Sequence, residues 1–525
     1  VAKSEKAAWS KIAAAVGGAV VLAAGIFFLG SSSSETMKPL GQDGANATNT
    51  NEQTQPLAKP IMLDTNRVVV LPFKTIGSAQ NSEDLGYGLV STLTSKLQPL
   101  QNLVIIANES ARKFKDTELS PKEIGQALQV GTIVTGEIQT SGEKVQVNIR
   151  VINANTEALG WGSSFSKNKS DYLDLQNEIA TKLASELKGG LDADEAQQLA
   201  QKATENAEAQ AEYQAGRREW NKRSKTGFDN AIKHYEKAID LDPGYAQPYV
   251  GLADTFLMIP LYNFGKPDTM MPKVRIYAEK AIQINPDIAG AYTSLGMLML
   301  QYEYNWTEAE KNFKKALQLN PNYAIGYHWF GVYLYLSGKA DEAIPVLKKG
   351  TELNPESVII KNGLALSYWH SGEKNKAVQL LDSVLENNPF FVPCLRTKYG
   401  YMLADLSDDS VNHLQKALKQ QPNQPTINWT LFQILWARGN TEDAKDQLIE
   451  LHAKYSDKLN KNKFAEIYFR MEKREYAYKY LEESIRAKEG NVLFTFITNS
   501  LKQYQSEPRF IDLMKSINHP LHTSK

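Results

Sequence analysis

A short phrase that recurs through the second half of the chain constrains the fold more than any other feature. Its clearest copies read AIDLDP, AIQINP and ALQLNP, and each copy ends in proline. These prolines are Pro243, Pro286, Pro321, Pro355, Pro389 and Pro422, with separations by subtraction of 43, 35, 34, 34 and 33 residues. A period near 34 residues with small residues at fixed offsets is typical of stacked helical hairpins. The sequence therefore predicts an array of helix pairs.

Small and large residues recur at fixed distances before these prolines. In the copy that ends at Pro321, the small residues are Ala309 and Ala316 and the large residue between them is Phe313. This pattern resembles the tetratricopeptide repeat, in which small residues let two antiparallel helices approach and large ones fill between them. The resemblance implies an all-α solenoid wound as a right-handed superhelix, in which proline ends each second helix.

The array is irregular at both ends. The first interval exceeds the others by about nine residues, and the surplus falls at Ile259–Asp268. We expect this insertion either to fold back on its own repeat or to form a contact loop. After Pro422 the pattern weakens, and a helix around Phe510 is expected to cap the open end of the solenoid.

The first thirty residues have a basic and then an apolar stretch. Lys3, Lys6 and Lys11 precede the charge-free run Ile12–Leu29, which has the minimum length for a transmembrane helix. Flanking lysines favour the cytoplasm, so we expect a single membrane span with the N-terminus in the cytoplasm and the bulk of the chain on the outer side. A secretory signal peptide has the same layout, and cleavage near Gly30 would instead release a soluble binder.

Residues 31–66 are rich in Ser, Asn, Thr, Gln and Gly and are predicted to form a flexible linker. The pattern then changes to short apolar runs and helical stretches in the order β-α-β-α-β-β-β-α. Along Lys144–Asn153 apolar and polar residues alternate, which is typical of a strand with one solvated face. This order predicts a small α/β sandwich.

The same region resembles a known family. The resemblance is carried by Val70–Phe73, Asp84–Leu89, Gly131–Ile138, Gln146–Asn153 and Leu175–Ala180, and the family is the TolB amino-terminal-like (FlgO-like) domain. In that family the domain commonly precedes tetratricopeptide repeats on the outer side of a membrane span. The resemblance thus implies a membrane-anchored bacterial protein, and it supplies no catalytic motif.

The predicted fold class is multidomain: an N-terminal transmembrane helix, a small α/β sandwich domain and an all-α solenoid. The expected segments are a cytoplasmic tail with the transmembrane helix, the linker, the α/β domain, a helical linker with the repeats, and C-terminal capping helices. Their boundaries are 1–30, 31–66, 67–190, 191–490 and 491–525.

Composition excludes several classes of function. The chain has 59 basic and 59 acidic residues, so bulk charge implies no nucleic-acid partner. The single cysteine, Cys394, cannot form an intrachain disulfide and is expected to be a small buried residue.

We find no catalytic, cofactor-binding or metal-binding motif. Ser164–Lys167 has the spacing of a serine–lysine acylase motif but lies at a predicted strand end. His519 and His522 have no carboxylate neighbour in the sequence. The basic residues Arg217, Arg218, Lys222 and Arg223 are interpreted as a solvated face of the first repeat helix, with phospholipid headgroups as the alternative contact.

The predicted site is a partner-binding groove lined by the first helix of each repeat. Its residues are Ile325, His328, Tyr335, Asn362, Leu366 and Trp369. These side chains make the groove aromatic and amide-rich, not cationic, and suit a protein or peptide segment held through aromatic anchors. In the alternative, Tyr335 and Trp369 pack into a neighbouring repeat.

The sequence therefore favours a membrane-anchored, non-catalytic periplasmic scaffold that binds protein or peptide partners and meets the membrane through Ile12–Leu29. The alternative is the sensor half of a signal-transduction receptor. Its cytoplasmic effector, a kinase, an adenylate cyclase or a winged-helix regulator, would be absent from this chain.

Overall fold

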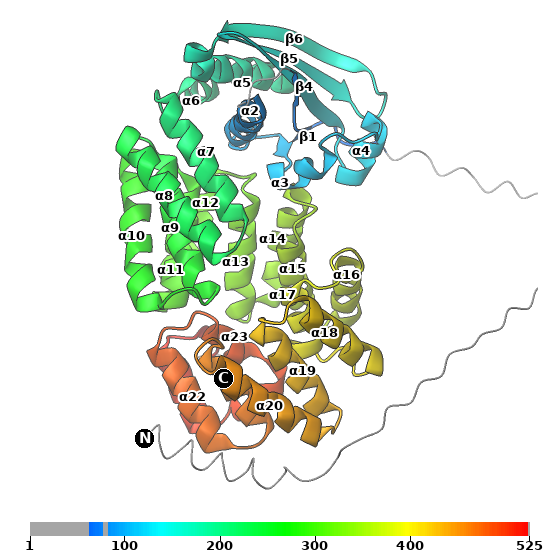
Figure 1. Cartoon of the computed structure of the whole chain (residues 1–525), viewed down its shortest axis with the longest axis vertical. Coiled ribbons are helices and arrows are strands. Elements are labelled where there is room, and N and C mark those ends of the chain that lie inside the picture. Colours follow the sequence, from blue (N-terminus) through cyan, green and yellow to red (C-terminus); the bar gives the residue numbers. More distant parts are fainter. Residues whose placement is uncertain (1–61, 77–81, 523–525) are drawn as a thin grey trace, which may run out of the picture. The chain divides into compact units, whose positions relative to one another are not determined.

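The computed structural model describes residues 62–76 and 82–522. The predicted membrane span Ile12–Leu29 and most of the predicted linker lie outside these residues. Within the described part of the chain, no helix is both long enough and apolar enough to cross a membrane. Most of this part is helical, with one small sheet near its beginning (Figure 1).

The sheet is mixed, with strand order β3-β1-β4-β5-β6, and β2 also pairs with β4. Its strands are β1 (Arg67–Val70), β2 (Lys74–Ile76), β3 (Val104–Ile105), β4 (Thr132–Ser141), β5 (Lys144–Asn153) and β6 (Leu159–Asn168). β1 runs parallel to β3 and β4, whereas β4, β5 and β6 are antiparallel. The alternation in β5 has the predicted effect, because its four apolar side chains, from Val145 to Val151, are all buried.

Helices pack on both faces of this sheet. On one face, α2 (Ser82–Leu97) and α5 (Tyr172–Lys188) share a core with Val68 and Val70 of β1. On the other face, Val69 packs with side chains of α3 (Asn108–Ala111), the 3-10 turn Arg112–Phe114 and α4 (Pro121–Leu128). Helix α4 begins with a capping box: the Ser120 hydroxyl accepts from the backbone N–H of Glu123, and the Glu123 carboxylate accepts from the backbone N–H of Ser120.

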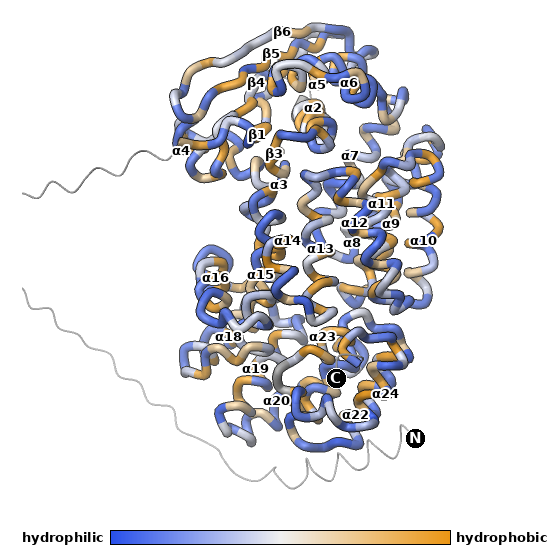
Figure 2. The backbone as a smooth tube through the Cα atoms, turned by 180° about the vertical axis from the view of Figure 1, so that it is seen from behind, coloured by the Kyte–Doolittle hydropathy of each residue, from blue (hydrophilic) through white to orange (hydrophobic). Residues whose placement is uncertain are grey.

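The remaining helices form antiparallel pairs. After α6 (Ala193–Ala200), the bounds are α7 (Ala207–Asn221), α8 (Lys225–Leu241), α9 (Ala246–Leu261), α10 (Pro267–Ile284), α11 (Ala289–Leu298), α12 (Trp306–Leu319), α13 (Ala324–Leu336), α14 (Ala340–Leu353), α15 (Val358–His370), α16 (Lys374–Asn387), α17 (Val392–Leu395), α18 (Asp408–Gln420), α19 (Pro425–Ala437), α20 (Thr441–Tyr455), α21 (Lys461–Arg470), α22 (Arg474–Arg486), α23 (Val492–Ile497) and α24 (Pro508–Ser516). α11 and α17 continue into π-helical turns at Met299–Glu303 and Arg396–Tyr401. Second helices such as α10 alternate hydrophobic and hydrophilic turns, as expected for helices with one buried face (Figure 2).

Large residues of the second helices fill spaces that only glycine leaves open. Tyr235 of α8 lies between Gly216 of α7 and Gly251 of α9, where an added Cβ would lie 2.5 and 2.6 Å from the tyrosine ring. Leu347 of α14 meets Gly331 of α13 in the same way, at 2.4 Å. Small residues at these positions therefore set how closely the helices approach, as the periodic pattern predicts.

The recurring prolines take part in a second regular contact. Their carbonyl groups follow the end of the second helix, where helical hydrogen bonds run out. A tyrosine six residues later, on the next helix, donates its hydroxyl to that carbonyl. The pairs are Tyr249 with Pro243, Tyr292 with Pro286 and Tyr327 with Pro321, at 3.2, 3.0 and 3.1 Å. The tyrosines therefore fix the angle between successive repeats.

The insertion at Ile259–Asp268 lengthens α9 and forms the turn into α10. Its aromatic residues Tyr262 and Phe264 stack on each other, and both meet the ring of Phe228 in α8. The insertion thus packs against the preceding helix pair, and both rings keep an exposed face. Cys394 is fully buried, as predicted.

The predicted fold class is wrong. The described residues form a mostly helical repeat solenoid with a small sheet region, without a described membrane-spanning helix, and they belong to one compact unit. The sheet region has hydrophobic cores of its own, and it hydrogen-bonds directly to the turns between repeats. The backbone N–H of Ala107 donates to the carbonyl of Leu353 at 2.7 Å, and the Asn322 amide donates to the carbonyl of Leu103 at 3.0 Å. Such polar contacts leave no trace in hydrophobic periodicity.

Candidate peptide-binding groove

The first helices of the pairs pack side by side and form the inner layer of the solenoid. Contacts run from α7 to α9, α11, α13 and α15 in turn, and the row continues through α17 and α19 to α21. Side chains that point inward from this layer line the predicted groove. The short helix α23 contacts both α13 and α21 and therefore lies across the inner side of the curve.

The middle of the inner layer holds two of the predicted residues with unused polar atoms. His328 on α13 and Asn362 on α15 are buried, and Ile325 on α13 is partly exposed. Within the described residues, Nδ1 of His328 and Oδ1 of Asn362 have no hydrogen-bond partner. Burial and the nearby Arg223 guanidinium lower the pKa of His328 to about 4, so its ring is neutral at pH 7. This part of the groove can therefore accept or donate hydrogen bonds.

The other predicted residues contact the chain's own C-terminal region. The ring of Tyr335 lies 6.1 Å from that of Phe494 on α23. Leu366 and Trp369 line a cavity of about 10 Å³ together with Phe494 and Ile497. A space of this size holds at most one water molecule. The structure therefore places Tyr335, Leu366 and Trp369 beneath α23, apart from His328 and Asn362.

A buried polar group holds α23 in place. Lys463 and Glu466 of α21 form an ion pair at 3.1 Å, with their side chains only 6% and 2% exposed. The Thr495 hydroxyl of α23 donates to Glu466 at 2.8 Å. The Lys463 ammonium also lies 4.6 and 4.4 Å from the ring centres of Tyr401 and Trp429. Sequence reasoning missed this group, because a Lys–Glu pair three residues apart is a common surface pattern.

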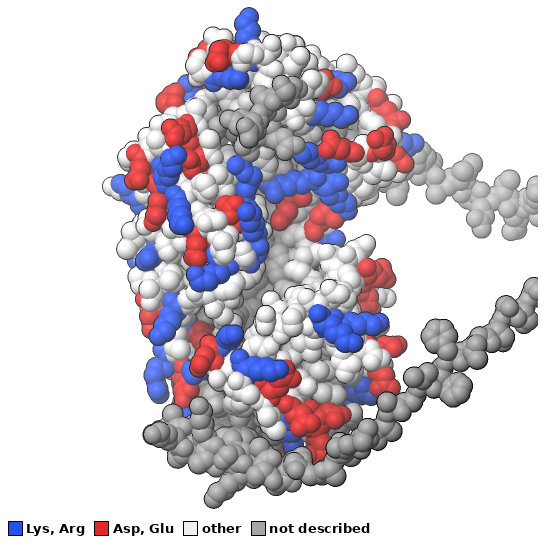
Figure 3. Space-filling view, in the orientation of Figure 1, with Lys and Arg blue, Asp and Glu red and all other residues white. Residues whose placement is uncertain are grey.

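The last described residues return to the middle repeats. The indole N–H of Trp306 donates to the carbonyl of Ile517 at 3.1 Å, and His519 packs on the same indole. Leu521 meets Gly338 after α13, where an added Cβ would lie 2.6 Å away. The C-terminal segment thus packs on the start of α12 and on the turn after α13, whereas the surface beside α7 is open and hollowed in the space-filling view (Figure 3).

Basic side chains gather on that open part. Arg217 of α7 is 25% exposed and lies 3.8 Å from the Asp254 carboxylate of α9. Arg223, just after α7, stacks at 3.5 Å on the ring of Trp220. This end of the inner layer therefore carries cations in addition to the aromatic and amide side chains predicted for the groove. Only Lys222 of the four basic residues is fully exposed, where it pairs with Glu219 on its own helix.

The sheet region supplies a fourth arginine to the same place. Arg112 donates to the hydroxyl of Tyr87 on α2, and its guanidinium lies 4.8 Å from the centre of that ring. Arg218 approaches the same ring at 5.7 Å. We call Arg112, Arg217, Arg218 and Arg223 the arginine cluster. In the space-filling view, basic side chains gather over α7 and the α3 region beside a hollow (Figure 3).

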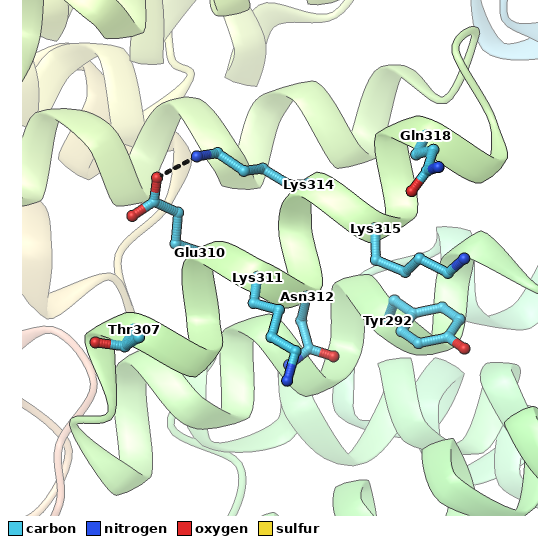
Figure 4. A pocket seen from close by; sticks show the side chains of 8 residues that line it. All are labelled: Tyr292, Thr307, Glu310, Lys311, Asn312, Lys314, Lys315 and Gln318. Atoms are coloured by element: carbon cyan, nitrogen blue, oxygen red, sulfur yellow. Dashed lines mark ion pairs between the residues drawn. The ribbon is translucent and has the colours of Figure 1, made fainter.

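A second depression lies on the outer side of the solenoid. It has a volume of about 700 Å³, runs along α12 and is lined by Lys311, Lys314 and Lys315, of which Lys315 lies beside Tyr292 (Figure 4). Lys314 pairs with Glu310 across one helical turn. Exposed pairs of this kind contribute little to binding. Among the described residues, no group of three or more His, Cys, Asp or Glu side chains is arranged to hold a metal ion.

Comparison with known proteins places the likeness in the repeats. Residues 334–392 and 228–245 match the tetratricopeptide repeat family. The transcriptional regulator HilA of Salmonella typhimurium is 24% identical over 288 residues, which are 54% of this chain and 50% of HilA. The chain thus spans about half the length of the curated relatives it matches.

Solved structures give the same likeness at low identity. Yeast Tom70 is 19% identical, with 60% of this chain and 68% of that chain covered and a TM-score of 0.38. A tetratricopeptide protein of Thermus thermophilus is 22% identical, with 36% and 96% covered and a TM-score of 0.31. Both family matches lie in the helical part, and the resemblance of residues 67–187 to the TolB amino-terminal-like domain stays a prediction. The helical part of this chain is a solenoid that contains tetratricopeptide repeats.

Proposed function

We propose that the protein is a non-catalytic scaffold that binds extended segments of other proteins along the inner layer of its repeats. The observation that carries this proposal is the open inner surface beside α7 and α13. There, buried polar atoms of His328 and Asn362 have no partner within the described residues. Buried polar groups are normally paired, and a bound peptide backbone supplies both donors and acceptors.

The predicted groove residues then have two roles. Ile325, His328 and Asn362 contact a partner directly in the open part of the groove. Tyr335 and Trp369, which lie beneath α23, contact a partner only after that helix moves aside. This division supports a groove whose two halves are used differently.

Site-specific photocrosslinking tests the proposal. A benzoylphenylalanine in place of Ile325 is expected to crosslink to partner proteins in cells, with the crosslinks mapped to short segments by mass spectrometry. The matched control is the same replacement at Ile276, which is 62% exposed on the second helix α10. Equal crosslinking from the two positions would refute binding along the inner layer.

A second candidate is the interaction region of a transcriptional regulator. It is supported by the likeness to HilA over 54% of this chain. To test this role, the chain is fused to a winged-helix DNA-binding domain and transcription of a reporter gene is measured. If no substitution of a groove residue changes the transcription of the reporter, this role is excluded.

The location also stays a prediction. The expectation that the protein works on the outer side of a bacterial cytoplasmic membrane depends on residues 1–30, outside the described part. Protease treatment of intact spheroplasts tests it, because a protein on that side is digested while a cytoplasmic marker survives.

A further inference from the structure

The arginine cluster is built by two parts of the chain that are distant in sequence. Arg112 follows α3 of the sheet region, whereas Arg217, Arg218 and Arg223 belong to the first repeat. The ring of Tyr87 connects them, because Arg112 and Arg218 both lie within 6 Å of its centre. The contacts between the sheet region and the repeats therefore assemble the cluster.

Arg223 is held in place but has no polar partner. Its guanidinium stacks on Trp220 at 3.5 Å, and within the described residues it makes no hydrogen bond or ion pair. The residue is partly buried and has a left-handed backbone conformation, with φ of 50°. Stacking fixes a guanidinium while its N–H groups stay available for a ligand.

The described carboxylates that lie near Arg223 already have other partners. The carboxylates near Arg223 are those of Asp254 and Glu109. Asp254 lies beside Arg217 and accepts from the Ser294 hydroxyl at 2.7 Å, and Glu109 accepts from the Asn354 amide at 2.9 Å. Within the described residues, the two carboxylates near Arg223 thus have other partners, and Arg112 and Arg223 form no ion pair, so both guanidinium groups are available to an acidic ligand.

Buried donors next to the cluster also lack partners. Nε of Arg112 and Nε1 of Trp220 are donors without a hydrogen-bond acceptor within the described residues, and Nδ1 of His328 also has no partner there. Trp220 and His328 are 5% and 7% exposed, respectively. Unpaired buried donors beside two guanidinium groups without ion pairs indicate a ligand that brings acceptors.

We propose that the arginine cluster binds acidic side chains of an extended partner peptide, with Arg223 and Arg112 pairing with its carboxylates. A peptide fits better than a nucleic-acid strand, because Asp254 and Glu109 would lie against a continuous row of phosphates. Carboxylates spaced along a peptide can avoid these two positions. The inference rests on the proposed function, since it specifies the class of peptide that the groove selects.

Fluorescence anisotropy with the full chain tests this inference. One labelled probe is a twelve-residue amidated peptide in which Glu alternates with Ser, and the other has Gln in place of every Glu. We expect the acidic probe to bind at least tenfold more tightly than the amide probe at low salt. Arg223→Gln is expected to remove most of this difference, and Arg223→Lys to keep part of it because the charge remains.

Lys222→Gln is the matched control, since it removes one positive charge from the adjacent residue on the exposed face. It is expected to change the affinity for the acidic probe less than twofold. Thermal unfolding of each variant separates loss of binding from loss of fold. Because Arg223 makes no hydrogen bond or ion pair within the described residues, its Gln variant is expected to lose only the stack on Trp220 and to stay folded at the assay temperature.

Each other outcome has a defined meaning. Equal binding of the two probes, or no binding of either, overturns the inference. The photocrosslinking from Ile325 decides the proposed function independently, because it requires no acidic partner. Inorganic phosphate that binds the cluster while neither peptide does would identify a phosphate site instead and would also overturn the inference.

Discussion

The contact between the sheet region and the repeats can be tested at Asn322, in the turn before α13. The Asn322 side chain is 2% exposed and makes three hydrogen bonds to the sheet region. Its Oδ1 accepts from the backbone N–H of Ile105 at 3.1 Å, and its Nδ2 donates to the carbonyls of Gln98 and Leu103 at 2.8 and 3.0 Å. Because β3 is the edge strand of the sheet, this amide supplies hydrogen-bond partners to backbone groups that would otherwise have none.

Asn322→Ala leaves the N–H of Ile105 and two carbonyls without partners. Leaving a buried polar group unsatisfied costs about 1–3 kcal/mol. Because the carbonyl of Gln98 lies nearer to solvent, we count only the other two groups, at about 1–2 kcal/mol each in the lower part of this range, and expect the opening of β3 to become easier by about 2–4 kcal/mol. Since each 1.4 kcal/mol changes an equilibrium tenfold, amide exchange at Ile105 should become roughly thirty- to several-hundredfold faster.

Hydrogen exchange with mass spectrometry on peptides that contain Ile105 measures this change directly. Asp287→Ala is the matched control, because Asp287 has the same position one repeat earlier and is exposed. The control is expected to leave exchange in the sheet region unchanged. If Asn322→Ala and Asp287→Ala give the same exchange at Ile105, the sheet region does not depend on this contact and the reasoning fails.

Three further predictions concern packing, the helix that covers the groove, and pH. Gly331→Ala should lower the free energy of unfolding by about 1–3 kcal/mol, because its Cβ would overlap the leucine of α14; Gly363→Ala, whose Cβ would make an ordinary 3.4 Å contact, should have a much smaller effect in urea unfolding. Phe494→Ala should cost about 2 kcal/mol and make Trp369 more accessible to acrylamide quenching, because the ring that covers the groove is removed. Because the folded-state pKa of His328 is about 4, below its unfolded value, its contribution is present above pH 6.5 and should be lost as pH falls from 6.5 to 4; the drop in stability should be smaller in His328→Gln.

These predictions fail in distinct ways. Equal destabilisation by the two glycine variants would show that space beside the leucine does not limit helix approach. Unchanged quenching in the Phe494 variant would show that α23 does not cover the indole. A stability profile between pH 4 and 6.5 that is identical with and without His328 would exclude its burial as a neutral ring.

The regular parts of the fold could be predicted from the sequence because a simple pattern encodes each of them. The proline period and its small residues give the helix pairs, and strict alternation gives β5. The contact through Asn322 could not be predicted in this way, because asparagine near the end of a helix is usually a local turn residue. Asn322 contacts the sheet region, whereas Asp287, at the same position one repeat earlier, is exposed.

The candidate site was predicted only in part, for a related reason. Periodicity identifies the first helix of each pair but does not say what lies over it. Nothing in the apolar run of α23 distinguishes a helix that covers Tyr335 and Trp369 from one that extends the array. Arg217 and Arg223 belong to a basic segment that looks solvated, and their inward position depends on where α7 crosses the inner layer. The signal that could have found them is the adjacent Trp220, because an aromatic residue beside arginines favours a stacked, partly buried cation.

The helix α23 also shows which chemistry the covered half of the groove accepts. Phe494 meets Tyr335 and Tyr401, and Thr495 donates to the buried Glu466 carboxylate. A partner that replaced α23 would need an aromatic ring and a hydroxyl donor in the same places, because otherwise Glu466 would lose a hydrogen bond in a buried site. Such a partner also competes with a segment of the same chain, whose effective concentration is high. In the open half with the arginine cluster, a partner needs no such ring or hydroxyl and displaces no segment of the chain. We therefore expect a partner to bind there first. It reaches the covered half only if it carries an aromatic residue followed by a residue with a hydroxyl group.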